Sequence, residues 1–418
     1  MNLPQSKHRA ARRELSESAA LKSILALFFL WGFLTALNDV LVPRLRSAFA
    51  LSYARAALIP VVFFTTCYLF APLAGLLIEK LGYRRVMSAG LVTMGIGTLL
   101  FLPATQAAKY HGFLLAIAVV GAGITVLQAA AAPYVSFLGP QALAPARFSL
   151  ALGFNSLGTM IAPLFGGWLI LRPTDVGPRI AGSIVAAMRE LRTPYLSLGC
   201  TLLLLALGVS FSRLPAMRSP PASAPLLYPV RSVLQHRPLI FGAVTAFLYA
   251  GAEIGIGSFL ILYLSQPEIL GVSQQSAAFL VSFYWGGAVA GRLLGWHLLK
   301  RWPVQYVLTA ISAGAIALVA TAVATHGTVA ATALLSVGLC NALIVPIVSM
   351  TAISGLGPLT ARASSVMVAA NLGAGLVPLA IGALADHIGI HHALALTVVC
   401  YACAFAYARF GFQARVAA

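Results

Sequence analysis

The sequence contains twelve stretches of about 20 apolar residues, separated by short segments rich in charge, proline or glycine. Inside lipid every backbone polar group must be paired within the protein, so continuously apolar stretches of this length favour spanning helices over the alternating strands of a barrel. We therefore predict an all-α membrane protein with twelve transmembrane helices. They lie near residues 24–43, 56–78, 86–103, 111–138, 147–171, 193–214, 239–264, 275–300, 304–325, 328–354, 362–384 and 390–411.

Composition and charge agree with this class. Hydrophobic residues make up 60% of the chain and charged residues only 9%, whereas a soluble domain carries roughly 25% charged residues. The formal net charge is +18, but the basic residues gather in the tails and in alternate loops, which is the positive-inside pattern and not a nucleic-acid surface. Arg44, Arg46 and Arg55 run against this bias. We expect a multi-pass protein of the cell inner membrane with both termini in the cytoplasm.

The longest charged and proline-rich interruption lies in the middle of the chain, at residues 212–238. It divides the predicted helices into six and six. We predict a cytoplasmic N-terminal tail at 1–23, an N-terminal six-helix half at 24–214, a cytoplasmic linker at 215–238, a C-terminal six-helix half at 239–411 and a cytoplasmic tail at 412–418.

The two halves carry weak internal symmetry. Gln128 stands five residues before Pro133 in the fourth span, and Asn341 stands five residues before Pro346 in the tenth. Both pairs are related by an offset of 213, close to half of the chain length. Internal repeats of this kind are typical of transporter folds, so we predict two six-helix pseudo-repeats.

Two carboxylates, Asp39 and Glu253, lie inside spans, in the first and the seventh, and are related by an offset of 214. A carboxylate at bilayer depth is costly and is by default a functional hypothesis. Low dielectric favours the neutral form of Asp39, so this side chain is our candidate for proton coupling. Glu253 is either a second proton or cation site, or the partner of Arg292 in a buried ion pair.

Two charged loop motifs follow apolar spans. GLLIEKLGYRR occupies residues 75–85, and the related GALADHIGIHH occupies residues 382–392. The first resembles the loop signature of the major facilitator superfamily, which prefers Asp where this chain has Glu79. The predicted motif residues are Gly75, Glu79, Gly82, Arg84, Arg85 and Asp386.

Longer segments narrow the resemblance. FFLWGFLTALNDVLVP at 28–43, GITVLQAAAAPYVSFLGP at 123–140 and YAGAEIGIGSFL at 249–260 resemble the fucose, galactose and glucose permease family. Gln128 is similar to the glucose/galactose branch, because the fucose branch has a glutamate there. The resemblance implies monosaccharide import by alternating access, driven by a co-transported cation, and Asp39 matches the carboxylate of the family's LND motif.

A hexose needs hydrogen-bonding amides, a carboxylate and aromatic faces in one cavity. The sequence offers ten candidates at span depth: Asn38, Asp39, Gln128, Asn155, Asn341, Asn371, Trp31, Tyr249, Tyr284 and Trp285. Ala132, Ser149 and Leu152 stand where the resembling family commonly has Asn, Asn and Gln. These lost hydrogen bonds leave the identity of the sugar open.

We therefore predict a monomeric, proton-coupled importer of a hexose, glucose or galactose, that uses no cofactor. A sodium-coupled or facilitative sugar carrier is one alternative, and an efflux pump for lipophilic cations is another. An enzyme is disfavoured, because no span carries a paired Ser and His, a zinc set or a nucleotide loop. The five cysteines are expected to pack within spans, and His387, His391 and His392 to be solvated loop residues without a metal.

Overall fold

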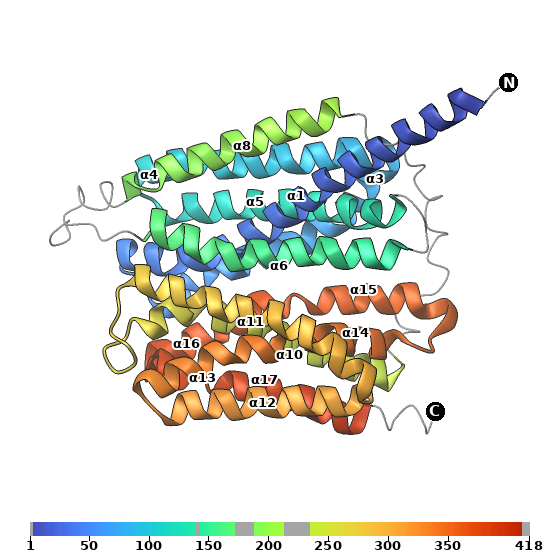
Figure 1. The fold of residues 1–418 in the computed structure, drawn as a ribbon. Coiled ribbons are helices and arrows are strands. Elements are labelled where there is room, and N and C mark those ends of the chain that lie inside the picture. The colour runs from blue at the N-terminus through green and yellow to red at the C-terminus, as the bar shows by residue number, and fades with distance from the viewer. Residues whose placement is uncertain (1–2, 139–142, 172–187, 213–234, 412–418) are drawn as a thin grey trace. The chain divides into compact units, whose positions relative to one another are not determined.

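The computed structural model describes residues 3–138, 143–171, 188–212 and 235–411, and nearly all of them are helical (Figure 1). Most of the predicted linker at 215–238 and all of the predicted tail at 412–418 lie outside the described residues. The helical character follows from the sequence, because continuously apolar segments of this length pair their backbone in lipid as helices and lack the alternation of barrel strands.

The helices are as follows: α1 Leu3–Phe49, α2 Tyr53–Ala56, α3 Leu58–Leu99, α4 Phe101–Ala107, α5 Tyr110–Phe137, α6 Ala144–Leu169, α8 Arg192–Phe211, α10 Arg237–Leu264, α11 Gln274–Arg301, α12 Val304–Ala324, α13 Gly327–Asn341, α14 Ile344–Ile353, α15 Thr360–Ala370, α16 Gly373–Ala393 and α17 Leu396–Ala406. A 3-10 turn at Gly357–Leu359 precedes α15, and a π-helical turn at Tyr407–Gly411 follows α17.

Within the described residues, ten helical segments are long and apolar enough to cross a membrane. One of them, Tyr53–Ala107, is long enough for two crossings and contains the non-helical residue Gly82. A shorter apolar segment, Leu396–Gly411, follows the last of the ten. Dividing the long segment at Gly82 and adding the short one reproduces the twelve predicted spans, so the predicted fold class is confirmed.

The chain forms two compact units. The first unit comprises Met1–Thr35, Leu69–Thr159 and Met188–Ser223, and the second comprises Ala36–Tyr68, Met160–Ala187 and Ala224–Ala418. The chain passes from one unit to the other within α1, α3 and α6. The division into six-helix halves at 24–214 and 239–411 remains our proposal.

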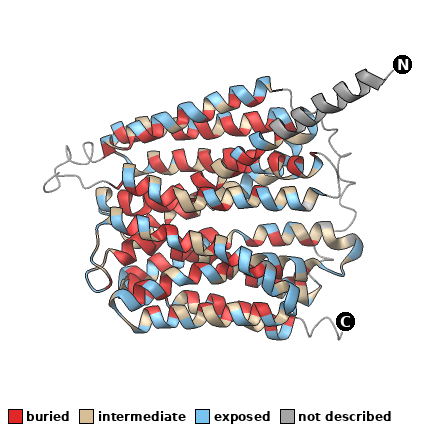
Figure 2. Cartoon of the chain, in the orientation of Figure 1, coloured by how far each residue is buried: buried red, intermediate tan, exposed pale blue. Residues whose placement is uncertain are grey.

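In the second unit, α10 is the central helix. It packs against α11, α14, α15, α16 and α17, and every residue from Gly255 to Leu264 is buried (Figure 2). A helix that is apolar and buried on all faces lies at the centre of its bundle. Polar side chains on α10 are therefore held in fixed surroundings.

In the first unit, glycines bring α3 and α5 into close contact. A Cβ added at Gly90 would lie 2.7 Å from the backbone nitrogen of Leu127, and one added at Gly97 would lie 2.6 Å from that of Val120. Membrane helices associate through van der Waals packing, and small residues allow their backbones to approach. These contacts stabilise the first unit without any polar group.

Gly82 and Gly389 hold equivalent places in the two loop motifs, three residues after Glu79 and Asp386. Gly82 has φ 76° and ψ 163°, and Gly389 has φ 78° and ψ 156°. Only glycine adopts this region without strain. The two motifs thus make the same local turn, as their related sequences suggest.

Two predicted spans are interrupted near their middle. The tenth breaks between α13 and α14, directly after Asn341, and the eleventh breaks between α15 and α16, at Asn371. Pro346 and Pro378 follow these breaks. Proline lacks a backbone N–H, so each ring leaves one carbonyl of the preceding turn without its usual partner. Interrupted helices of this kind line the substrate sites of many transporters.

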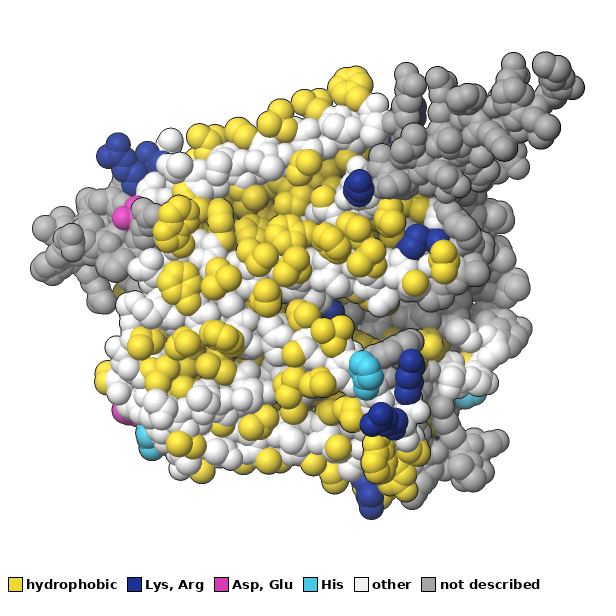
Figure 3. All heavy atoms as spheres, viewed as in Figure 1, with side chains coloured by type: hydrophobic (Ala, Val, Ile, Leu, Met, Phe, Trp, Pro, Cys, Tyr) yellow, Lys and Arg dark blue, Asp and Glu magenta, His cyan; other side chains and the backbone are white. Residues whose placement is uncertain are grey.

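The outer surface is strongly apolar. Hydrophobic side chains cover much of the face seen in Figure 3, and exposed residues include Leu204, Phe211, Phe283 and Met350. A soluble monomer rarely exposes contiguous apolar surface of this extent. The surface is that of a protein embedded in lipid.

The crossing of α11 and α13 yields a first testable prediction. A Cβ added at Gly338 would collide with the backbone of Tyr284, so we expect Gly338→Ala to cost about 1–3 kcal/mol through overpacking. Thermal unfolding of the purified protein in detergent would show a lower melting temperature. Gly314→Ala is the control, because its Cβ would meet only the Cys340 sulfur at 3.4 Å. Equal melting temperatures for the two variants would contradict the prediction.

Candidate functional site

The carboxyl group of Asp39 is buried in the second unit, with 6% of the residue exposed. Ser258 of α10 donates a hydrogen bond of 2.8 Å from its Oγ to Oδ1 of Asp39. Glu253, also on α10, lies near enough for its charge to act on Asp39. The apolar sequence of α1 carries this carboxylate into the protein interior, where α10 supplies its polar neighbours.

Two buried donors lie beside or near this carboxylate. The ring of Trp285 and the carboxyl group of Asp39 both border Gly257, at 2.9 and 3.4 Å from the place of an added Cβ. Nε1 of Trp285 and Nδ2 of Asn38 are buried without a hydrogen-bond partner among the described residues. Buried donors are almost always paired in proteins. These two N–H groups are therefore suited to bind an acceptor that the chain itself does not provide.

Asn341 is the centre of a buried hydrogen-bond network at the break after α13. Its Nδ2 donates to the hydroxyl of Tyr284 at 2.8 Å, and its Oδ1 accepts from the hydroxyl of Tyr401 at 2.8 Å. Its backbone oxygen accepts from the hydroxyl of Tyr249 at 2.6 Å. The hydroxyl of Tyr284 in turn donates to the backbone oxygen of Glu253 at 2.9 Å. The network joins α10, α11, α13 and α17.

This network gives three of the predicted site residues hydrogen-bond partners within the protein, and their contact with a sugar stays a proposal. The amide of Asn341 and the hydroxyls of Tyr249 and Tyr284 already have protein partners, and all three residues are at most 3% exposed. Tyr284 connects this network to the backbone of Glu253. Tyr284 and Trp285 also pack edge to face, with ring centroids 5.2 Å apart.

Glu253 and Arg292 differ in exposure. Glu253 is half-buried on α10, and Arg292 is exposed on α11. The positive charge of Arg292 acts on the carboxyl group of Glu253. An ion pair between them stays a proposal, alongside a proton or cation site at Glu253.

Three predicted site residues belong to the first unit. Nδ2 of Asn155 donates to the backbone oxygen of Phe28 at 3.1 Å, which ties α6 to α1. The ring of Trp31 lies 5.4 Å from that of Phe28. Gln128 is exposed on α5, although the seven residues before it, 121–127, are buried. The remaining candidate, Asn371, is exposed at the break of the eleventh span in the second unit.

Two of the predicted loop-motif residues, Arg84 and Asp386, form hydrogen bonds with the backbone of other helices or loops. Nη1 of Arg84 donates to the backbone oxygen of Ser212 at 3.1 Å in the first unit. In the second unit, the carboxylate of Asp386 accepts the backbone N–H groups of Tyr53 and Ala54, at 2.6 and 3.0 Å. Asp386 therefore caps the start of α2. Glu79 and Arg85 are exposed, and Gly75 has open space around it.

The expectation of solvated histidines is wrong for His391. This residue is 3% exposed and lies parallel to the rings of Tyr263 and His326, at 5.8 and 4.8 Å. Its Nε2 is 2.9 Å from the backbone oxygen of Val323. α16 continues past Gly389 and places His391 against these two rings. Their π-faces cover the imidazole, which explains its burial. In the part of the chain that the structure describes, no cluster of His, Cys, Asp or Glu could hold a metal.

Ser258 and Tyr401 are site residues that the sequence did not indicate. Ser258 lies inside the segment YAGAEIGIGSFL at 249–260, but a single serine in an apolar helix is a weak signal. Tyr401 stands in an ordinary apolar span. Their importance depends on contacts with residues 219 and 60 positions away.

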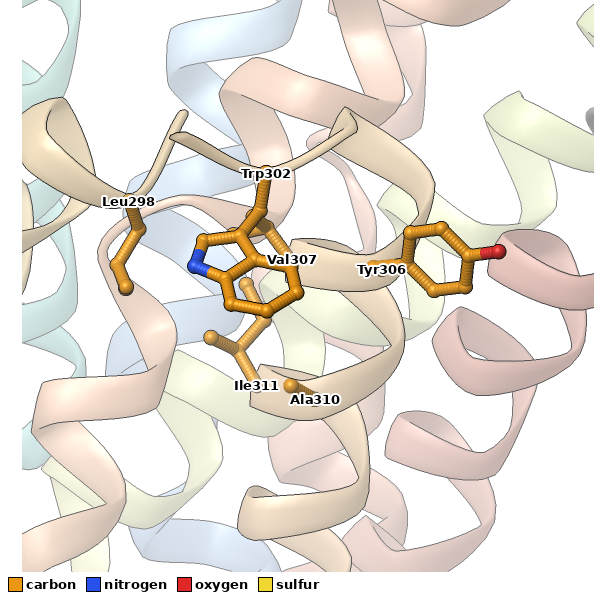
Figure 4. Close-up of a pocket in the computed structure, with 6 residues that line it drawn as sticks. All are labelled: Leu298, Trp302, Tyr306, Val307, Ala310 and Ile311. Atoms are coloured by element: carbon orange, nitrogen blue, oxygen red, sulfur yellow. The ribbon is translucent and has the colours of Figure 1, made fainter. Parts of the chain in front are cut away.

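A separate groove lies between the end of α11 and the start of α12 (Figure 4). It has a volume of about 390 Å³, and its walls are Leu298, Trp302, Tyr306, Val307, Ala310 and Ile311. The rings of Trp302 and Tyr306 are exposed. The apolar walls offer little to a polar solute, so the buried polar cluster around Asp39 is the better candidate site.

A helical membrane protein with interrupted spans beside buried carboxylate, amide and aromatic groups has the architecture of a secondary transporter. The sequence comparison agrees, because the family model of the Major Facilitator Superfamily matches residues 24–370. The chain belongs to the major facilitator superfamily. It is a multi-pass membrane transporter and not an enzyme.

Relatives extend over nearly the whole chain. A glucose/galactose transporter of Brucella abortus is 39% identical over 386 residues, which are 92% of each chain. The L-fucose-proton symporter of Escherichia coli is 31% identical over 93% of this chain and 92% of its own. The crystal structure of that symporter in the outward conformation has a TM-score of 0.68 and covers 95% of this chain and 99% of its own. The inward-open xylose transporter of E. coli, at 13% identity and a TM-score of 0.70, shares the fold.

The Asn341 network yields a second prediction. Asn341→Leu removes both side-chain hydrogen bonds and leaves the buried Tyr401 hydroxyl unpaired, so we expect a loss of about 1–3 kcal/mol of stability. Adding Tyr401→Phe removes that orphaned hydroxyl and should recover part of the loss. Thermal unfolding of the single and double variants measures both effects.

Asn371→Leu is the matched control for this prediction, because it removes an exposed amide at the other interrupted span. It should leave the melting temperature nearly unchanged. If Asn371→Leu costs as much as Asn341→Leu, the network contributes no special stability.

Proposed function

We propose that the protein imports a hexose, glucose or galactose, by proton-coupled alternating access. The names of its relatives support this proposal, since they include a glucose/galactose transporter and an L-fucose-proton symporter. The observation that carries the proposal is the buried Asp39 beside the ring of Trp285. Nε1 of Trp285 and Nδ2 of Asn38, the chain neighbour of Asp39, have no hydrogen-bond partner within the described part of the chain. This combination provides both a proton carrier and groups for a neutral polar solute.

The chemistry of the site suits a sugar. A sugar hydroxyl oxygen can accept from Nε1 of Trp285 and from Nδ2 of Asn38, and a hydroxyl hydrogen can be donated to Asp39. The indole face of Trp285 can lie against the apolar face of the ring. A lipophilic cation would leave both buried donors unpaired, which disfavours the efflux alternative.

Asp39 is the proposed proton carrier. Its buried position favours the neutral form, and the hydrogen bond from Ser258 favours the ionised form. A carboxyl group balanced in this way can bind a proton from one side of the membrane and release it to the other. Glu253 is the second candidate for a proton, with pairing to Arg292 as the alternative.

The remaining proposals concern the whole molecule. We place both termini in the cytoplasm, because the basic residues favour that side. We infer that the protein acts as a monomer in the inner membrane. Alternating access would then follow from movement between the halves at 24–214 and 239–411, with sugar binding shifting a nearly balanced equilibrium.

Uptake of labelled hexoses into proteoliposomes tests the function directly. We expect accumulation of glucose or galactose when the outside is made acidic, and collapse of the accumulated sugar after a protonophore is added. Accumulation that requires sodium and ignores pH would overturn proton coupling. Export of lipophilic cations without hexose transport would overturn the sugar assignment.

Asp39→Asn tests the proton carrier. The amide keeps the size of the side chain but cannot release a proton, so accumulation should be abolished while exchange of internal for external sugar continues. Glu253→Gln is measured in parallel and separates the two carboxylates. Full accumulation by Asp39→Asn would show that another group carries the proton.

Gln128→Ala tests the proposed sugar contact in the first unit. Loss of one amide should weaken the apparent affinity about three- to tenfold, which corresponds to a hydrogen bond of about 0.5–1.5 kcal/mol. The control is Gln106→Ala, which removes another exposed glutamine from the same unit, on α4. Equal affinities for the wild type and Gln128→Ala would assign Gln128 to packing.

A further inference from the structure

The hydrogen bond between Ser258 and Asp39 joins two segments that are 219 positions apart. Asp39 lies in the first predicted span and Ser258 in the seventh, so the bond links helices of the two proposed halves. Both residues are buried, with 6% and 1% of their surface exposed. Water cannot easily take the place of either partner.

The surroundings fix the geometry of this bond. Gly257, the neighbour of Ser258, leaves room for the ring of Trp285, because an added Cβ would lie 2.9 Å from its Cζ2, and Oδ2 of Asp39 borders the same position at 3.4 Å. On the other side, Val40 packs against Gly166 of α6, where an added Cβ would lie 2.7 Å from Cγ1 of Val40. The Ser258 hydroxyl therefore meets the carboxyl group at a defined position.

The same segment of the chain is docked at a second place. Asp386 of α16 accepts the N–H groups of Tyr53 and Ala54 at the start of α2. Gly382 of α16 lies against the backbone of Tyr53, with an added Cβ 2.7 Å from its carbonyl oxygen. Residues 36–68 thus lie against α10 and α16 in the described arrangement.

We propose that Ser258 is a positioning residue that makes the contact between α1 and α10 depend on the protonation of Asp39. The proposal rests on the proposed function of Asp39 as proton carrier. An ionised carboxylate accepts a charge-assisted hydrogen bond, which is roughly twice as strong as a neutral one. Release of the proton strengthens this contact, and binding of a proton weakens it. Protonation thereby favours separation of the two helices.

Other titratable or charged residues lie on the helices around Asp39. Glu253 of α10 and Tyr284 of α11 are titratable groups whose charges interact with Asp39. Arg44 is a buried charged residue further along α1. The Ser258 hydroxyl is the neighbour that favours the ionised form by direct hydrogen bonding.

The test is sugar exchange in proteoliposomes with equal pH on both sides. Exchange requires protonated Asp39 and falls as the pH rises. Ser258→Ala removes the group that favours the ionised form, so the half-point of this fall should move up by about one pH unit. Proton-driven accumulation, which needs proton release, should slow severalfold more than exchange.

Three variants complete the experiment. Ser258→Thr keeps the hydroxyl and should restore the wild-type half-point. Ser282→Ala is the matched control, because Ser282 is a buried serine of α11 whose Oγ has no hydrogen-bond partner among the described residues. Its profile should equal that of the wild type. In Asp39→Asn the pH dependence should be absent, with or without Ser258→Ala.

The half-point does not depend on the amount of protein, so a less stable variant still gives an answer. An unchanged half-point in Ser258→Ala overturns the inference while Asp39→Asn still supports the proposed function. A wild-type protein without pH dependence overturns the proposed function itself. A shift in Ser282→Ala of the same size as in Ser258→Ala would reduce the effect to general packing.

Discussion

The backbone polar groups in the interior of this transporter must find partners within the protein, because lipid supplies none. The interruption between α13 and α14 shows how the constraint is met. The backbone oxygen of Asn341 accepts a hydrogen bond from Tyr249, and the side chain of Asn341 uses two further tyrosines. A broken helix would be costly in lipid. Here hydrogen bonds to Asn341 at the break connect α10, α11, α13 and α17.

That arrangement separates two kinds of polar group. The amide of Asn341 and the tyrosine hydroxyls are used within the protein, so they support the shape of the site. Nδ2 of Asn38 and Nε1 of Trp285 have no partner among the described residues. Groups of the second kind are the ones free to gain a hydrogen bond from a transported solute. Asp39 shares features of both kinds. It accepts a hydrogen bond from Ser258, and its carboxyl group can accept further hydrogen bonds.

Much of the architecture could be read from the chain. Apolar segments of spanning length predicted the helices because only helices and closed barrels pair their backbone in lipid. The matching spacing of Gln128–Pro133 and Asn341–Pro346 predicted the local helix structure less well than the apolar segments predicted the spans. The fourth span is one continuous helix around Pro133, whereas the tenth is broken before Pro346. The same spacing of amide and proline therefore does not determine whether a helix breaks. A break also needs neighbouring side chains that can bind the backbone groups left without helical partners.

His391 is a residue whose burial the sequence did not predict. A histidine next to His392 at a predicted span boundary looks solvated, yet packing against Tyr263 and His326 buries it. The sequence by itself determined the membrane class, the spans, the family resemblance and the unusual carboxylate at Asp39, because these depend on local composition and motif. Tertiary structure alone decided that Ser258 meets Asp39, that Tyr401 meets Asn341 and that the Trp285 donor has no hydrogen-bond partner among the described residues. Hydrogen bonds between distant residues depend on how helices are placed against one another, and no local pattern encodes that placement.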